Sequence, residues 1–127
     1  MEFVILGSSL NNSAFAPLHM SALLELQEWY LAHCNDEWEH GQGVRVETLD
    51  NPGWKLVVDL AGTELSGKYF DAVAVNCDAG NGTDEQHWFH CTIQSQKFTA
   101  YGGPRNLDTL LQIFLDWAKA DHTDPKQ

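Results

Sequence analysis

Basic side chains are scarce in this chain, which has seven lysines and arginines against 18 aspartates and glutamates, for a formal net charge of -11. A field of that sign repels the phosphates of nucleic acid and anionic membrane surfaces, and it speeds association with cationic partners. We therefore expect no direct nucleic acid binding and no membrane binding. A partner with a basic surface fits this charge, and so does acidity that serves only solubility.

Long apolar runs are also absent. No stretch approaches the ~20 residues that cross a bilayer, and the first residues lack the cationic start of a secretory signal peptide. The three cysteines include no Cys-x-x-Cys pair and do not form a disulfide framework. These features predict a cytoplasmic protein with reduced thiols.

The motifs of common enzymes are missing as well, since the sequence has no glycine-rich phosphate loop, nucleophile elbow or dinucleotide fingerprint. Cys34 falls at a predicted helix C-terminus, where the dipole disfavours a thiolate, and Cys77 and Cys91 are expected to face the core. On a strand His90 points away from His87 and Cys91, so the three do not close on one metal ion. We expect no catalytic residue, no metal and no cofactor. The alternatives are a small cytosolic enzyme that uses a thiol or bound metal, and an acidic adaptor domain.

Composition changes along the chain predict three parts: a peripheral N-terminal extension at residues 1–19, a single domain at residues 20–120 and a polar tail at residues 121–127. The domain begins with a helix at about Ser21–His33, and the Ser21 hydroxyl is its predicted cap. Apolar residues at helical spacing predict the buried stripe of this helix. They are Leu23, Leu26, Tyr30 and Cys34, and Leu24 and Leu31 widen the stripe.

Alternating apolar and polar residues predict two strands, at about 44–49 and 54–60, joined by the tight turn Asp50-Asn51-Pro52-Gly53. Further strands are expected at about 69–77, 87–94 and 97–101. Asn106 then caps a final helix that ends near Ala120. Strands gathered between two helices favour an α+β fold, with an antiparallel meander sheet of about five strands and an N-terminal and a C-terminal helix packed on one face.

The aromatic residue Trp38 stands among carboxylates and has no periodic apolar neighbour. Aromatic side chains beside charged residues are common anchors of protein interfaces. We therefore predict a partner-binding surface around Trp38 that includes the tip of the first hairpin. Its predicted members are Asp36, Glu37, Trp38, Glu39, His40, Glu47, Asp50 and Asn51.

Several longer motifs resemble one known family. They are Leu26-Gln-Glu-Trp-Tyr30, Cys34-Asn-Asp-Glu-Trp-Glu-His40, Glu47-Thr-Leu-Asp-Asn-Pro-Gly-Trp54, Asp59-Leu-Ala-Gly-Thr-Glu-Leu65 and Gly102-Gly-Pro-Arg-Asn-Leu107. Over residues 20–119 the chain resembles the immunity protein 53 family of bacterial polymorphic toxin systems, which is encoded beside toxin genes. The resemblance implies a cytoplasmic protein that binds and neutralises a cognate toxin domain without catalysis. The acidic charge predicts that this toxin is basic, and a nuclease is one candidate.

Overall fold

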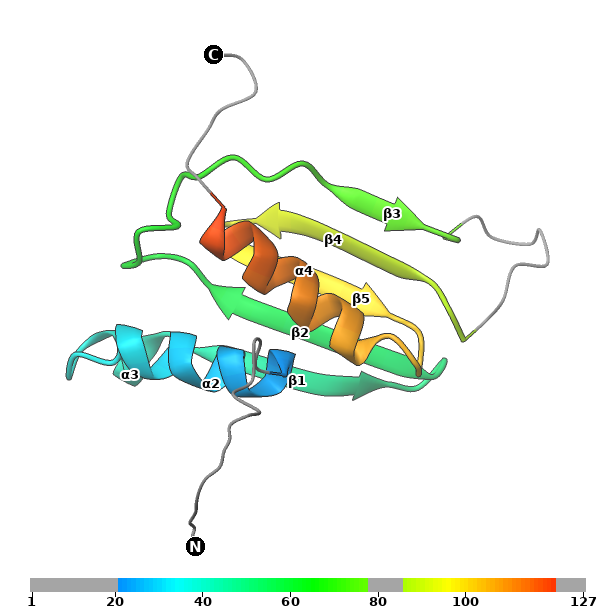
Figure 1. Cartoon of the computed structure of the whole chain (residues 1–127), viewed down its shortest axis with the longest axis horizontal. Coiled ribbons are helices and arrows are strands. Elements are labelled where there is room, and N and C mark those ends of the chain that lie inside the picture. Colours follow the sequence, from blue (N-terminus) through cyan, green and yellow to red (C-terminus); the bar gives the residue numbers. More distant parts are fainter. Residues whose placement is uncertain (1–20, 78–85, 121–127) are drawn as a thin grey trace, which may run out of the picture.

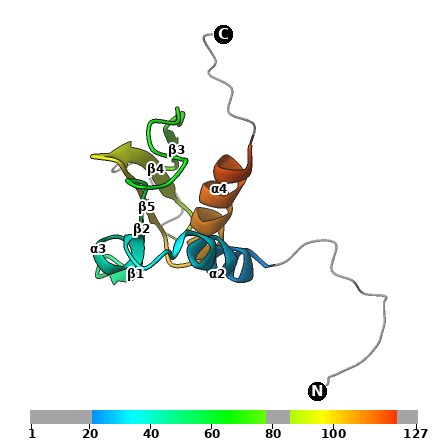
Figure 2. The ribbon, with the colours of Figure 1, turned by 90° about the vertical axis from the view of Figure 1, so that its left-hand side faces the viewer.

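A five-stranded antiparallel sheet, covered on one face by two helices, forms the body of the computed structural model, which describes residues 21–77 and 86–120 (Figures 1 and 2). The helices are α2 (Ala22–His33), α3 (Trp38–Gly41) and α4 (Leu107–Lys119), and the strands are β1 (Val44–Leu49), β2 (Gly53–Asp59), β3 (Val73–Val75), β4 (Phe89–Gln94) and β5 (Lys97–Gly102). The predicted α+β fold with five antiparallel strands is confirmed. The predicted extension at residues 1–19 and the tail at 121–127 lie outside the described residues.

The strand order is β1-β2-β5-β4-β3, which differs from a simple meander at one connection. After β2 the chain crosses to the far edge of the sheet, and β3, β4 and β5 then return as a meander to the side of β2 (Figure 1). In β2, Leu56, Val57 and Val58 are all buried, so this strand needs a neighbour on each side. By contrast β3 has only three residues and is mostly exposed, which suits an edge position.

The hydrophobic core lies between the sheet and the pair α2 and α4. Phe98 of β5 is fully buried and its ring centroid lies 5.2 Å from that of Phe114 on α4. Burial of such side chains provides most of the free energy of folding. The other fully buried apolar residues are Leu56, Val58, Leu60, Leu65, Cys91, Ala100 and Leu110.

Helix α2 begins as predicted, because the amide of Leu24 donates to the Ser21 hydroxyl at 3.2 Å. Its buried stripe is different from the predicted one. Ala22 and Leu26 are buried, and the exposed fraction is 60% for Leu23. The remaining residues of the observed inner face are Trp29 and His33. Of the predicted members, Tyr30 is exposed and Cys34 is half-buried.

Two local predictions need correction. Asn106 does not cap α4 with its side chain, because its Oδ1 atom accepts instead from the amide of Trp88 at 3.0 Å. Cys91 is buried as predicted, but Cys77 is exposed and its thiol donates to the carbonyl of Phe89. The β1–β2 turn contains a cis Asn51–Pro52 peptide bond. Among the described helices, none is long and apolar enough to cross a membrane.

Candidate functional site

Two side chains, those of Asn35 and Glu39, hold the loop between α2 and α3 by accepting hydrogen bonds from its backbone amides. The Oδ1 atom of Asn35 accepts from the amides of Glu37 at 3.0 Å and Trp38 at 2.9 Å. In return, the Glu39 carboxylate accepts from the amides of Asn35 and Asp36, both at 2.8 Å. These bonds satisfy amides that the start of a helix otherwise leaves unpaired, so the loop has a defined shape.

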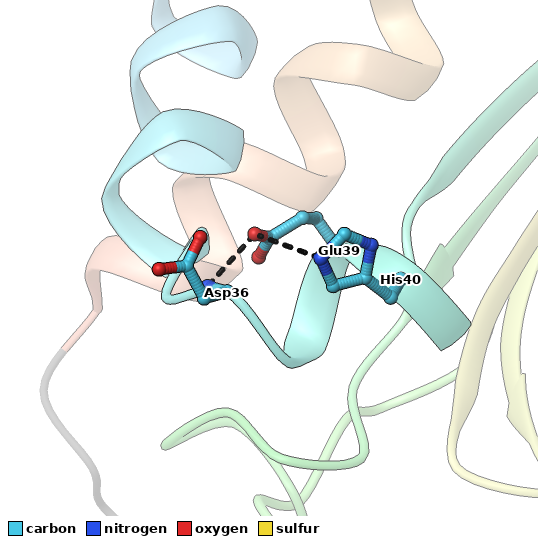
Figure 3. Close-up of side chains that lie close together, drawn as sticks. All are labelled: Asp36, Glu39 and His40. Atoms are coloured by element: carbon cyan, nitrogen blue, oxygen red, sulfur yellow. Dashed lines mark hydrogen bonds and ion pairs between the residues drawn. The ribbon is translucent and has the colours of Figure 1, made fainter.

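Glu39 therefore has an internal role. The hydrogen bond from its own backbone amide, with those from Asn35 and Asp36, lowers the pKa of the Glu39 carboxyl below its usual value. Asp36, Glu39 and His40 each place one oxygen or nitrogen atom within 4.8 Å of the others, a donor set that divalent metal ions use (Figure 3). Both Glu39 oxygens already accept hydrogen bonds from backbone amides. The hydrogen bonding of the loop therefore explains why these three side chains lie close together.

Trp38 is buried, and the prediction that it lies on the surface is wrong. Its exposed fraction is 5%, and its ring centroid lies 5.8 Å from that of Trp29 and 5.9 Å from that of His33. The indole Nε1 donates to the carbonyl of Ala61 at 3.0 Å. A partner could reach this ring only if the loop unfolded, so Trp38 supports the loop from beneath.

The other predicted site residues fall into two groups that are far apart. Asp36, Glu37 and His40 are exposed at the end of the sheet where β1 begins. Asp50 and Asn51 are exposed in the β1–β2 turn, at the opposite end of β1 (Figure 1). Glu47 lies on β1 between them, opposite Lys55 of β2. One compact surface does not include all of these residues.

Helix α2 exposes an apolar face whose two leucines were expected to widen its buried stripe, and that expectation is wrong. Leu24 and Leu31 have exposed fractions of 49% and 63%. Together with Glu28 they stand at intervals of four and three residues, so they share one face of the helix. We call Leu24, Glu28 and Leu31 the outer face of α2. Among the described residues, the carboxylates of Glu28, Asp36 and Glu37 form no hydrogen bond or ion pair, so they are free to meet a partner.

A groove separates α2 from the first residues of β1. Its volume is about 420 Å³ and its lining is mostly apolar, with Leu23, Leu26 and Tyr30 on the helix side and Val44 and Arg45 on the strand side. Leu23 and Tyr30 were assigned to the core from their spacing, which is why this groove was missed. The groove lies on a different side of α2 from the outer face.

The sheet face that the helices leave uncovered carries a buried charge. Asp59 has an exposed fraction of 1%, and it accepts hydrogen bonds from Lys97 at 2.8 Å, from the amide of Gly43 at 2.8 Å and from Arg45 at 3.3 Å. Burial on its own would raise the pKa of Asp59, but the hydrogen bonds from Lys97 and Arg45 lower it. This carboxylate is a structural bridge between three strands and is not available to a substrate.

The thiols do not form a catalytic site with the histidines. Burial, with a smaller contribution from Cys77, raises the pKa of the Cys91 thiol to about 12, so it is protonated at neutral pH. His90, its neighbour on β4, stacks on Tyr101 with ring centroids 6.3 Å apart. Because Tyr101 lies opposite His90 on β5, and Ala100 of the core lies opposite Cys91, the two side chains point to different faces of the sheet.

Comparison with known proteins adds one match. The family model described as immunity protein 53 matches residues 23–119, from the first turn of α2 to the end of α4. The predicted resemblance is therefore confirmed over nearly the whole described chain. Neither a curated protein nor a solved structure matches the sequence.

Proposed function

The chain belongs to the immunity protein 53 family, and we propose that it binds a cognate toxin domain in the cytoplasm and neutralises it by covering a surface that the toxin needs. The proposed docking surface consists of the outer face of α2 and the two carboxylates that follow this helix. Its members are Leu24, Glu28, Leu31, Asp36 and Glu37. The inhibition is steric and electrostatic, and it uses no catalysis.

The observation that carries this proposal is the exposure of two leucines on one helix face beside carboxylates without internal partners. A single exposed leucine needs no explanation. Leu24 and Leu31, at 49% and 63% exposed, instead form an apolar centre with Glu28 between them, and the exposed Asp36 and Glu37 follow in the loop after the helix. An apolar centre with a polar rim is the usual composition of a protein interface.

The charge of this surface favours a basic toxin. The net charge of -11 steers the chain toward cationic partners. If the toxin is a nuclease, its substrate path is lined by cations that bind phosphates. Carboxylates such as Asp36 and Glu37 would occupy that path and exclude nucleic acid.

The other residues of the sequence prediction have different places in this proposal. Trp38 and Glu39 hold the loop that presents Asp36 and Glu37, through the bonds to Ala61 and to the loop amides. Asp50 and Asn51 are left out of the docking surface, because they lie at the opposite end of β1 (Figure 1).

The test measures the affinity for the toxin domain encoded beside this gene by calorimetry at several salt concentrations. Leu24→Ala with Leu31→Ala should cost at least about 2 kcal/mol of binding free energy, because it removes the apolar centre. Asp36→Asn with Glu37→Gln should weaken binding and reduce its dependence on salt. Matched controls are Tyr69→Ala and Asp71→Asn, which change exposed residues ahead of β3. If the two double variants bind as well as the two control variants, the proposed docking surface is wrong. If the wild-type protein does not bind the toxin domain, the proposed function is wrong.

A further inference from the structure

Strand β1 is a long edge of the sheet that the described residues form. Among the described strands it pairs only with β2, and it has six residues, compared with three in the opposite edge strand β3. Val46 at its centre is 45% exposed. Proteins usually protect such an edge with charged side chains, proline, a bulge or a covering segment. Strand β1 carries Arg45 and Glu47, but it contains neither proline nor a break in its pairing with β2. An edge of this kind is suited to pairing with another strand.

The backbone of β1 offers its free hydrogen-bonding groups at alternate residues. The amide of Asp59 donates to the carbonyl of Gly43, and these two residues lie opposite each other in the β1–β2 register. Because antiparallel pairs alternate, Arg45 and Glu47 also direct their backbone groups toward β2. Val44, Val46 and Thr48 therefore direct their amides and carbonyls outward, away from the sheet.

We propose that β1 pairs with β1 of a second copy of this chain, antiparallel about a two-fold axis at Val46, so that the two sheets become one. In this register Val46 faces Val46 of the partner copy, and Val44 faces the partner's Thr48. These are the residues with outward backbone groups, so each pair exchanges two hydrogen bonds. Arg45 faces the partner's Glu47 across the axis, and Glu47 faces the partner's Arg45.

The charges of β1 select this register over its neighbours. Opposite charges at directly facing positions stabilise an antiparallel pair, and like charges destabilise it. Moving the axis by one residue toward the N-terminus of β1 would place Arg45 against Arg45. Moving it one residue the other way would place Glu47 against Glu47. The sequence Val-Arg-Val-Glu-Thr is thus complementary to itself when Val46 is the centre.

Apolar surface accompanies this edge on the helix side of the sheet. Val44 and Val46 lie opposite Val58 and Leu56 of β2, which belong to the core. The groove beside them is lined by Leu23 and Tyr30 of α2. A two-fold pair would remove Val46 of both copies from water and would leave the outer face of α2 free. The inference is therefore independent of the proposed toxin-docking surface.

The first test is sedimentation velocity of the full chain over a range of concentrations. The wild-type protein should convert from monomer to dimer as concentration rises. Val46→Lys, which places two like charges at the axis, should sediment as a monomer throughout. The matched control is Val75→Lys on the other edge strand, where the valine is 38% exposed, and it should dimerise like the wild type. A wild-type monomer at every concentration, or a dimer that persists in Val46→Lys, would overturn the proposal.

The second test checks the register by cross-linking in a Cys34→Ser and Cys77→Ser background. Val46→Cys should form a disulfide-linked dimer on mild oxidation, because the two-fold axis brings position 46 against itself at a Cα separation of about 5.5 Å. Thr48→Cys should not, because the two copies of position 48 would be about 13 Å apart along the strands. Equal cross-linking of both variants contradicts the register. If the chain is monomeric and Val46→Lys instead weakens toxin binding, the edge belongs to the toxin and the dimer is rejected.

Discussion

The ammonium group of Lys97 lies 2.8 Å from Oδ1 of Asp59, on the sheet face opposite the core residue Val58. The second carboxylate oxygen of Asp59 binds the amide of Gly43 at 2.8 Å and the Arg45 guanidinium at 3.3 Å. One buried carboxylate of β2 thus connects β1 and β5. Because β1 is the strand that carries the proposed dimer edge, Asp59 also fixes the position of that edge.

Replacement of this carboxylate should destabilise the fold. Asp59→Asn keeps the size of the side chain but leaves Lys97 without its anion, and its amide group cannot accept all the bonds that the carboxylate accepts. We expect a loss of about 2 kcal/mol in the free energy of unfolding, measured with urea. Asp71→Asn, at an exposed residue, should change it by less than about 0.5 kcal/mol. An equal effect of the two substitutions would contradict the structural role of Asp59.

The same group makes stability depend on pH. The lowered pKa of Asp59 in the folded state means that the unfolded chain binds a proton more readily. Its contribution to the free energy of unfolding is complete above the ordinary aspartate pKa of about 3.9 and is lost as pH falls through the lower folded pKa. The difference in stability between the wild-type protein and Asp59→Asn should therefore be constant from pH 7 to about 5 and shrink below about 4. A difference that grows on acidification would show that the pKa of Asp59 is raised.

Much of the fold follows from local patterns in the sequence. The β1–β2 hairpin, the Ser21 cap and the span of the final helix were all predicted, because each depends on residues close together in the chain. The position of β3 was not predicted, since its pairing with β4 rather than β2 depends on burial in the complete sheet. Local alternation identifies a strand, but it does not identify the strand's neighbours.

The candidate site was harder to predict, because two apolar stripes overlap on α2. Leu23, Leu26 and Tyr30 repeat at helical spacing, and so do Ala22, Leu26 and Trp29. Only the second set faces the core, since the indole of Trp29 packs on Phe114 with ring centroids 5.0 Å apart. A small alanine two turns before a tryptophan on the same helix face was the available signal for close approach to α4. The burial of Trp38 had no such signal, because its partner is a backbone carbonyl 23 residues away.

The burial of Trp38 gives a prediction that separates structure from binding. Trp38→Ala should cost about 3–5 kcal/mol in the free energy of unfolding, because it opens a cavity beneath the loop. Trp38→Phe keeps a ring and loses the bond to Ala61, so its cost should be smaller. Folded Trp38→Phe should bind the toxin domain with nearly unchanged affinity. A large loss of affinity in a protein of normal stability would restore Trp38 as an interface anchor.

Glu39 should act through the shape of the loop. Glu39→Ala removes the acceptor of the Asn35 and Asp36 amides, and we expect it to lower the free energy of unfolding, as the loss of a helix cap does. Glu39→Gln keeps one amide oxygen as an acceptor and should cost less. Urea unfolding measures both. If Glu39→Ala leaves stability unchanged and lowers only toxin affinity, Glu39 is a direct contact.

The reactivity of the thiols tests the alternative that this protein is an enzyme with a cysteine nucleophile. The Cys91 side chain is fully buried and its pKa is raised to about 12, so it should resist alkylation at pH 8 as long as the protein is folded. Cys77 is exposed and should react, although its thiol donates to the carbonyls of Val75 and Phe89. Mass spectrometry after timed alkylation assigns each rate, and denaturant should make the two thiols equally reactive. Because a nucleophile must be both ionised and accessible, rapid modification of Cys91 in the folded chain would favour the enzyme.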